Sequence, residues 1–135
     1  MADGCKQRDV VADLKNEVLV YEHLAALQGK VIPDLLAGGF WRDEYLFFLA
    51  TAVVEGEQPS SATADAYPEA EKALRKIHAM GVVHRAVRRR NMLVARKGRS
   101  FKVWFLDFET SRIAAAPEEF DQDMADLRRV FRRSD

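Results

Sequence analysis

The side chains best suited to chemistry are concentrated between His84 and Glu109. The stretch from His84 to Lys102 contains eight Lys or Arg residues and no Asp or Glu. A run of cations without carboxylates can neutralise phosphate groups. Carboxylates return after this stretch, at Asp107 and Glu109. The sequence therefore places a region that could hold phosphates next to two acidic side chains.

Several other chemistries find no support in the sequence. It contains no GxGxxG, GxxxxGK[ST], GxSxG or HExxH motif. The histidines, His23, His78 and His84, are too scattered along the chain to suggest a metal site. The single cysteine, Cys5, excludes an intramolecular disulfide and a CxxC metal site, and we expect it to be an ordinary surface thiol.

A pair of short motifs carries a family resemblance. Residues 84–91 read HRAVRRRN, and a predicted hairpin leads from them to 107–109, which read DFE. This order resembles the catalytic segment of the protein-kinase-like superfamily, in which HRDxxxxN is followed by a hairpin and DFG. The matching positions are His84, Arg85, Asn91, Asp107 and Phe108. The likeness covers about residues 1–112 and is greatest to fungal-type kinase-like domains, while the DFE form also resembles small-molecule kinases for choline or aminoglycosides.

The resemblance implies a site for ATP and Mg²⁺. Asn91 and Asp107 match the family's magnesium ligands. Glu17 matches the glutamate that pairs with the phosphate-binding lysine, and without that lysine it would be left unpaired. The strand expected over Tyr45–Val54 resembles the one that leads to the hinge, where Ala52 and Val53 would offer backbone groups to adenine.

The sequence departs from the family in ways that bear on catalysis. The position of the catalytic Asp is Ala86, between His84, Arg85 and Arg88, and a methyl group accepts no proton. We expect the glycine-rich loop and the strand that carries the phosphate-binding lysine to be absent. Lys6 and Lys15 are poor substitutes for that lysine, because neither lies on a preceding strand. Glu109 replaces the glycine of DFG, and the short stretch after it contains no APE-like segment.

These departures predict a catalytically defective kinase-like domain, a pseudokinase or fragment, with ATP and Mg²⁺ binding that is weak or lost. One alternative is an active phosphotransferase acting on a protein or a small molecule, which would need a recruited base and lysine. Another is nucleic-acid binding through the basic 85–102 stretch, with Phe101 and Trp104 stacking on bases. A net charge of zero, from 21 basic and 21 acidic side chains, argues against a nucleic-acid partner.

The elements that must position these residues begin with a helix over about 9–28. Its apolar face is expected to be formed by Leu14, Val18, Tyr21 and Ala25. Glu17 falls on the apolar side of this helix, where a carboxylate needs a cation or hydrogen-bond donors.

Two strands follow within residues 38–50, joined by a polar turn at 42–44. The second strand is apolar on both faces, which predicts a central strand.

The second half of the sequence predicts more helix. A helix over 67–80 would bury Ala70, Ala73, Leu74 and Ile77. A hairpin would pair 92–95 with 101–106 around a turn at 96–100. A third helix would begin at Pro117 with an apolar stripe of Phe120, Met124, Leu127 and Phe131.

The fold class expected from these elements is α+β, a partial kinase-like fold with an N-lobe remnant of helix and antiparallel strands and a truncated, mainly helical C-lobe with a small hairpin. We expect a single domain over 1–135, divided into an N-lobe remnant and hinge (1–58), a catalytic-segment core (59–113) and a C-terminal helix (114–135).

The sequence also gives expectations about the location and the partners of the protein. The opening residues lack the apolar segment of a secretory signal, and no apolar run approaches the ~20 residues of a membrane span, so we expect a cytoplasmic protein with no membrane partner. The shortened C-lobe would leave apolar surface exposed, which predicts marginal stability and either a protein partner, still unidentified, or self-association.

Overall fold

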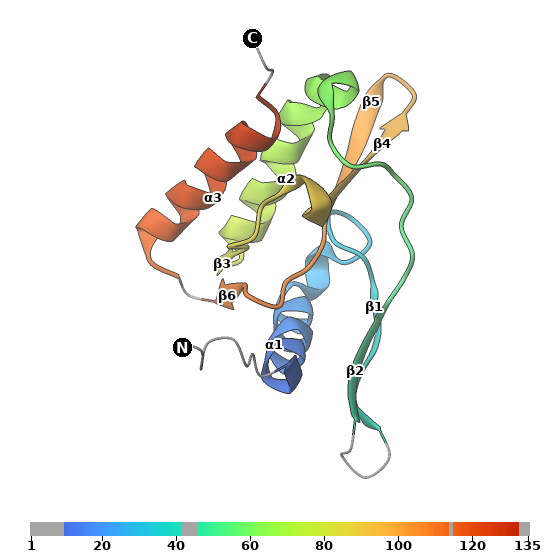
Figure 1. Cartoon of the computed structure of the whole chain (residues 1–135), viewed down its shortest axis with the longest axis vertical. Coiled ribbons are helices and arrows are strands. Elements are labelled where there is room, and N and C mark those ends of the chain that lie inside the picture. The colour runs from blue at the N-terminus through green and yellow to red at the C-terminus, as the bar shows by residue number, and fades with distance from the viewer. Residues whose placement is uncertain (1–9, 42–45, 114, 133–135) are drawn as a thin grey trace, which may run out of the picture.

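The computed structural model describes residues 10–41, 46–113 and 115–132, and Figure 1 shows their arrangement. Three α-helices and one β-hairpin form the main body, and another hairpin, earlier in the chain, extends from it. No helix of the described residues is long and apolar enough to cross a membrane.

Helix α1 spans Val10–His23 and is followed by a short 3-10 helix, η2, over Ala25–Leu27. The α-helix is thus shorter than predicted, and Gly29 reverses the chain with a φ of +78°. The predicted buried face is also partly wrong, because Ala25 is exposed. The face that α1 buries is formed by Glu17, Val20 and Tyr21, and Leu24, directly after the helix, is also buried.

The extended hairpin consists of β1 (Leu35–Trp41) and β2 (Leu46–Thr51), which pair antiparallel with an irregularity near Leu35. The prediction that the second strand is central is wrong for the described residues, where β2 pairs with β1 alone. The polar turn predicted at 42–44 lies outside the described residues.

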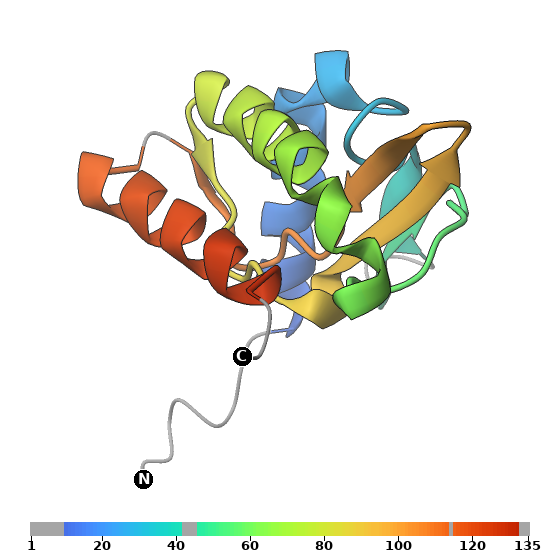
Figure 2. The same ribbon diagram turned by 90° about the horizontal axis from the view of Figure 1, so that it is seen from above.

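Helix α2 spans Tyr67–Ala79, after the 3-10 helix η3 (Ser61–Ala66). Its predicted buried residues are all buried. Pro68 suits its first turn because that turn needs no backbone N–H from it. Helix α3 spans Pro117–Val130 and packs beside α2, as Figure 2 shows from above.

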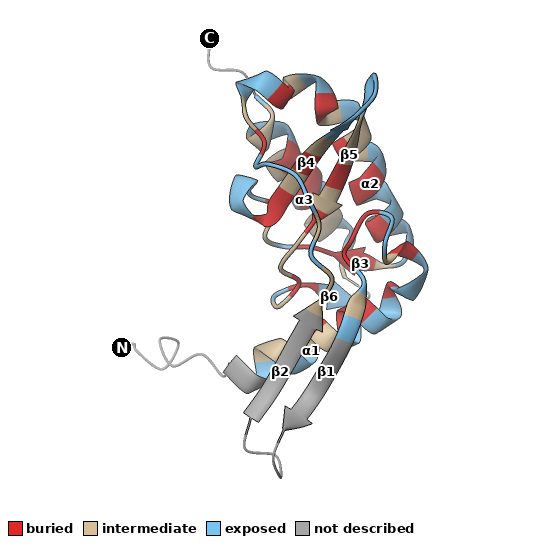
Figure 3. Ribbon diagram, turned by 90° about the vertical axis from the view of Figure 1, so that its right-hand side faces the viewer, coloured by how far each residue is buried: buried red, intermediate tan, exposed pale blue. Residues whose placement is uncertain are grey.

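The second hairpin consists of β4 (Met92–Lys97) and β5 (Ser100–Phe105), and it packs against α2. Its first strand is longer than predicted, its second begins one residue earlier, and its turn is tighter, since Gly98 turns the chain with a φ of +61°. Alternation sends Val94, Val103 and Phe105 into the core. Figure 3 shows the buried residues gathered between this hairpin and the helices.

Three short elements complete the site region. Strands β3 (Val82–Val83) and β6 (Arg112–Ile113) pair antiparallel, and the 3-10 turn η4 (Arg89–Asn91) precedes β4. The segment from His84 to Asn91 therefore lies between β3 and β4, and the segment from Asp107 to Ser111 lies between β5 and β6.

Candidate functional site

A buried carboxylate on α3 organises the start of the 84–91 loop. Asp123 is 1% exposed and accepts hydrogen bonds from the backbone nitrogens of His84 (2.7 Å) and Arg85 (2.9 Å). It also pairs with Nε2 of His78 at 2.9 Å. Because a buried carboxylate requires several partners, these contacts both satisfy Asp123 and fix the loop backbone.

Arg85 needs this support because its φ is +71°, a region that costs a non-glycine residue roughly 1–2 kcal/mol. Asp107 has a φ of +65° as well. The two motifs of the candidate site therefore each contain one left-handed residue, and such conformations persist only where neighbouring contacts over-determine them.

His84 is buried and joins the two motifs. Its Nδ1 accepts a hydrogen bond from the backbone nitrogen of Ala86 (3.1 Å), so Nε2 carries the proton that is donated to the carbonyl oxygen of Leu106 (2.8 Å). Burial lowers the pKa of His84 below 6.5, which favours this neutral form. Ser111 Oγ donates to the His84 carbonyl oxygen at 2.9 Å. The ring thus holds the 84–86 and 106–111 segments together.

Asn91 and Asp107 line one hollow of about 310 Å³, together with Ala86. The Asn91 Nδ2 donates to the carbonyl oxygen of Ala86 at 2.8 Å, so the amide oxygen of Asn91 is the atom that could serve as a metal ligand. Magnesium in nucleotide sites takes one or two carboxylates, with phosphates and water completing its oxygen ligands. The oxygens of Asn91 and Asp107 fit that requirement, whereas the methyl group of Ala86 contributes no polar atom.

Glu17 is not among the residues that line this hollow. It is 7% exposed, and its Oε2 accepts a hydrogen bond from the backbone nitrogen of Phe108 at 2.8 Å. Burial is the main reason that the pKa of Glu17 is raised above 4.5, and the hydrogen bond from Phe108 opposes the shift. No ion pair joins Glu17 to a lysine of the described residues.

The neighbouring Asn16 contacts the same segment. Its Nδ2 donates to the carbonyl oxygens of Glu109 (3.0 Å) and Ser111 (2.9 Å). Two successive residues of α1 therefore hold the backbone of 108–111.

The predicted hinge residues, Ala52 and Val53, do not line the hollow that contains Asn91 and Asp107. They line a separate hollow of about 530 Å³ with Trp104, and that hollow does not include Asp107. The chain after them is attached to β4, because Glu57 and Val94 exchange two backbone hydrogen bonds of 3.0 and 2.8 Å. The structure thus brings Ala86, Asn91 and Asp107 together, but not the hinge residues.

The basic 85–102 stretch is divided between two places. Arg85, Arg88 and Arg90 line the hollow beside Asp107. The later cations lie on the β4–β5 hairpin. There the Arg96 guanidinium lies 4.7 Å from the ring centre of Phe101, and the Lys102 ammonium lies 4.6 Å from that of Trp104. Each aromatic ring is already covered on one face by a cation, which does not favour base stacking or the nucleic-acid alternative.

Sequence reasoning missed Asp123 and its link to His78. One signal was present, because Asp123 lies beside Met124 and four residues before Leu127, on the side of α3 that is buried. A carboxylate at such a position needs hydrogen-bond donors, as Glu17 does on α1.

Comparison with solved structures supports the kinase-like fold. The chain resembles a crystal structure of the Rad53 kinase domain with SCD2, with a TM-score of 0.62 and 16% sequence identity. The match covers 93% of this chain and 52% of that chain, so the protein spans about half the length of the kinase it resembles. A sequence search of curated proteins finds no match.

A family model gives a more specific assignment. The model of the lipopolysaccharide kinase (Kdo/WaaP) family matches residues 50–135, which include the 84–91 loop, Asp107 and α3. The sequence predicted the greatest likeness to fungal-type kinase-like domains, and the family that this model describes is a different one. The fold, the paired motifs and the family model agree, and the chain belongs to the lipopolysaccharide kinase (Kdo/WaaP) family within the protein-kinase-like superfamily.

Proposed function

We propose that the chain is a kinase-like domain that binds ATP and Mg²⁺ weakly and is defective in phosphoryl transfer. The observation that carries this proposal is Ala86. It occupies the position of the proton-accepting aspartate, in a loop whose other contacts, from His84, Asn91 and Asp123, are all formed.

The proposed binding function depends on Asn91 and Asp107. Their oxygens would hold Mg²⁺, which when bound offsets the negative charge of the nucleotide phosphates. Arg85 and Arg88 line the same hollow and add positive charge beside it. We expect weak nucleotide binding because no lysine of the described residues is ion-paired with Glu17.

The proposed defect is in proton transfer. A positioned general base typically contributes about 10²–10⁴-fold in rate. Without one, an acceptor hydroxyl at Ala86 must lose its proton to water. The family name points to a sugar hydroxyl of a lipopolysaccharide as the acceptor that an intact site of this kind would use.

Two measurements on the purified chain test the proposal. Nucleotide binding is read as a magnesium-dependent rise in melting temperature with ATP, which Asp107→Ala should abolish. Transfer is read as ATP turnover in the unaltered chain and in Ala86→Asp, with Ala79→Asp as the control because Ala79 is an exposed alanine at the end of α2.

The expected result is magnesium-dependent ATP binding with turnover at background, and a rise of at least tenfold in Ala86→Asp but not in Ala79→Asp. Turnover by the unaltered chain that disappears in Asp107→Ala would instead establish the active phosphotransferase. A melting temperature that does not respond to ATP and Mg²⁺ would exclude the binding function.

A further inference from the structure

The two outer edges of the β4–β5 hairpin differ in how they are paired. On the β4 side, Glu57 and Val94 exchange two backbone hydrogen bonds, so the N–H and C=O of Val94 point away from β5. Val94 lies opposite Val103 in the register of the hairpin, and the two therefore form a non-hydrogen-bonded pair. The backbone N–H and C=O of Val103 consequently point outward from β5, on the side away from β4.

These outward groups of Val103 have no hydrogen-bond partner among the described residues. Two residues along the same edge, the Phe105 N–H donates to the carbonyl oxygen of Val31 at 2.9 Å, and this pairing does not continue to Val103. Val103 is only 3% exposed, and a buried backbone donor and acceptor without partners are costly. This position therefore favours a ligand that supplies both an acceptor and a donor.

A hollow of about 160 Å³ reaches this edge of β5 and is rich in lysine. Lysines from three parts of the chain contribute to its lining: the turn after η2, the exposed side of α2, and β5 itself. One carboxylate, that of Glu69, contributes as well. We call this hollow the β5-edge groove, and it is defined by Lys30, Glu69, Lys72, Lys76, Lys102 and Val103.

The lysines of the groove are not paired within the described part of the chain. No ion pair joins Lys30, Lys72, Lys76 or Lys102 to a carboxylate of the described residues. Burial, and after it the nearby ammonium groups of Lys97 and Lys76, lower the pKa of Lys102, so like charges lie close together here. Four lysines against one carboxylate leave the groove positive, which favours an anionic occupant.

We propose that the β5-edge groove binds an extended acidic segment of a partner protein. One residue of that segment exchanges two backbone hydrogen bonds with Val103, as Glu57 does with Val94 on the other edge of the hairpin. The acidic side chains of the segment contact Lys72 and Lys76. In strand addition of this kind, main-chain hydrogen bonds give affinity and alternate side chains give specificity. An acidic peptide suits the groove better than a nucleic acid, because it offers a main-chain donor and acceptor together with carboxylates.

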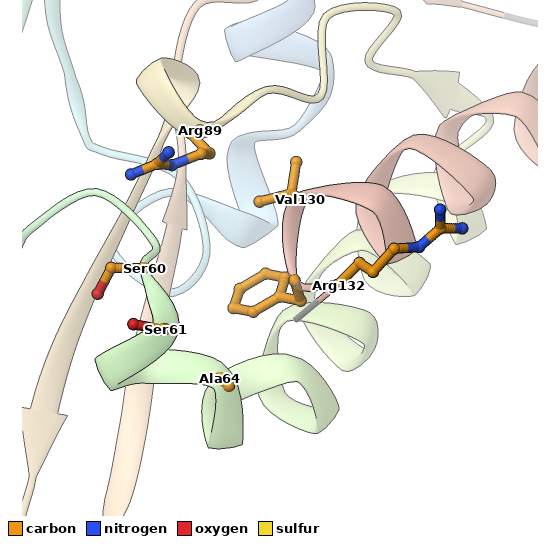
Figure 4. A pocket seen from close by; sticks show the side chains of 7 residues that line it. Ser60, Ser61, Ala64, Arg89, Val130 and Arg132 are labelled. Carbon is orange, nitrogen blue, oxygen red and sulfur yellow. The ribbon is translucent and has the colours of Figure 1, made fainter. Parts of the chain in front are cut away.

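The β5-edge groove is separate from the candidate active site, because no residue lines both hollows. The proposal therefore does not depend on ATP binding or on phosphoryl transfer. A matched control comes from another hollow, of about 700 Å³, between η3 and the end of α3. Figure 4 shows Arg89 and Ser61 lining that hollow, with the exposed Arg132 directed away from it. Reversing the charge of Arg132 changes the net charge of the chain without touching the groove.

The experiment is calorimetric titration of the full chain with a capped heptapeptide of alternating glutamate and threonine. Three ligands are compared with it: the same peptide with every main-chain amide N-methylated, a lysine–threonine peptide, and a short single-stranded RNA. The acidic peptide should bind about tenfold or more tighter than each of these, and its affinity should fall as salt is raised. Lys72→Glu and Lys76→Glu should each weaken it about fivefold or more, whereas Arg132→Glu should change it less than about twofold.

Amide hydrogen exchange gives a second measurement, which a purely electrostatic contact would not change. Bound peptide should slow the exchange of the Val103 N–H about tenfold or more, while that of Trp104, which is paired with Leu93 inside the hairpin, should change little. Melting temperatures check that each variant is folded. Any of four results would overturn the proposal: no binding of the acidic peptide at low salt, equal binding of its N-methylated form, tighter binding of the RNA, or unchanged exchange at Val103.

Discussion

The carboxylate of Asp123 lies 2.7 Å from the backbone nitrogen of His84, although 39 residues separate them in the chain. The same carboxylate accepts from the next backbone nitrogen, that of Arg85, at 2.9 Å. Helix α3 thus contributes directly to the shape of the 84–91 loop.

The substitution Asp123→Asn should destabilise the fold by about 2–4 kcal/mol, because hydrogen bonds to a buried charged acceptor are lost and Arg85 loses the support for its positive φ. Urea unfolding measures this change. Asp126→Asn on the same helix is the control and should cost less than about 1 kcal/mol, since its pairing with Arg129 is exposed. Equal effects of the two substitutions would contradict the role given to Asp123.

The His84 ring should remain neutral in the folded protein across the range where a free imidazole takes up a proton. Burial lowers the pKa of His84 below 6.5, so between the two values the unfolded state binds more protons. The contribution of His84 to stability is therefore complete above pH 6.5 and is lost as the pH falls through this window. NMR titration of the imidazole checks this, and a ring shift centred near pH 6.5 in the folded protein would refute it.

Glu17 should give the opposite dependence on pH. Burial raises the folded-state pKa of Glu17 above 4.5, so between 4.5 and that raised pKa the folded state binds more protons than the unfolded state. The contribution of Glu17 to stability therefore falls as the pH rises through this range. Glu17→Gln keeps an acceptor for the Phe108 N–H and should flatten this slope. Melting temperatures from pH 4.5 upward, compared with the exposed Glu22→Gln, measure the difference; parallel curves for the wild type and Glu17→Gln would count against it.

Gly56 should tolerate a side chain poorly, because an added Cβ would lie 3.0 Å from the carbonyl oxygen of Val94 and 3.1 Å from Cβ of Leu93. Gly56→Ala should therefore cost about 1–3 kcal/mol by forcing the chain away from β4. Gly98→Ala is the matched control, since nothing lies within 4 Å of an added Cβ there and only its φ of +61° is strained. Chemical denaturation should show Gly56→Ala to be the more damaging change, and the reverse order would disprove the contact.

Local patterns predicted those parts of the fold that depend on neighbours along the chain. The spacing of Ala70, Ala73, Leu74 and Ile77 specifies the buried face of α2, and the alternation after Met92 specifies the second hairpin. The paired motifs brought Asn91 and Asp107 together in the prediction, and both line one hollow in the structure.

The remaining features depend on tertiary partners that spacing cannot supply. The apolar residues of 45–50 predicted a central strand, yet β2 pairs with β1 alone among the described residues. In the sequence, Asp123 is one of several acidic residues of a helix, and only the structure shows that it accepts hydrogen bonds from the backbone of His84 and Arg85. Likewise, the acceptor role of Glu17 towards Phe108 appears only when residues 91 positions apart meet.

Hydrogen bonding of Asn16 and Glu17 to the backbone of residues 108–111 makes α1 and that segment one cooperative unit. Three hydrogen bonds of 2.8–3.0 Å join them, and each would break if α1 moved away. The amide hydrogen of Phe108 therefore exchanges with solvent only when α1 opens, so its protection reports the opening free energy of the helix.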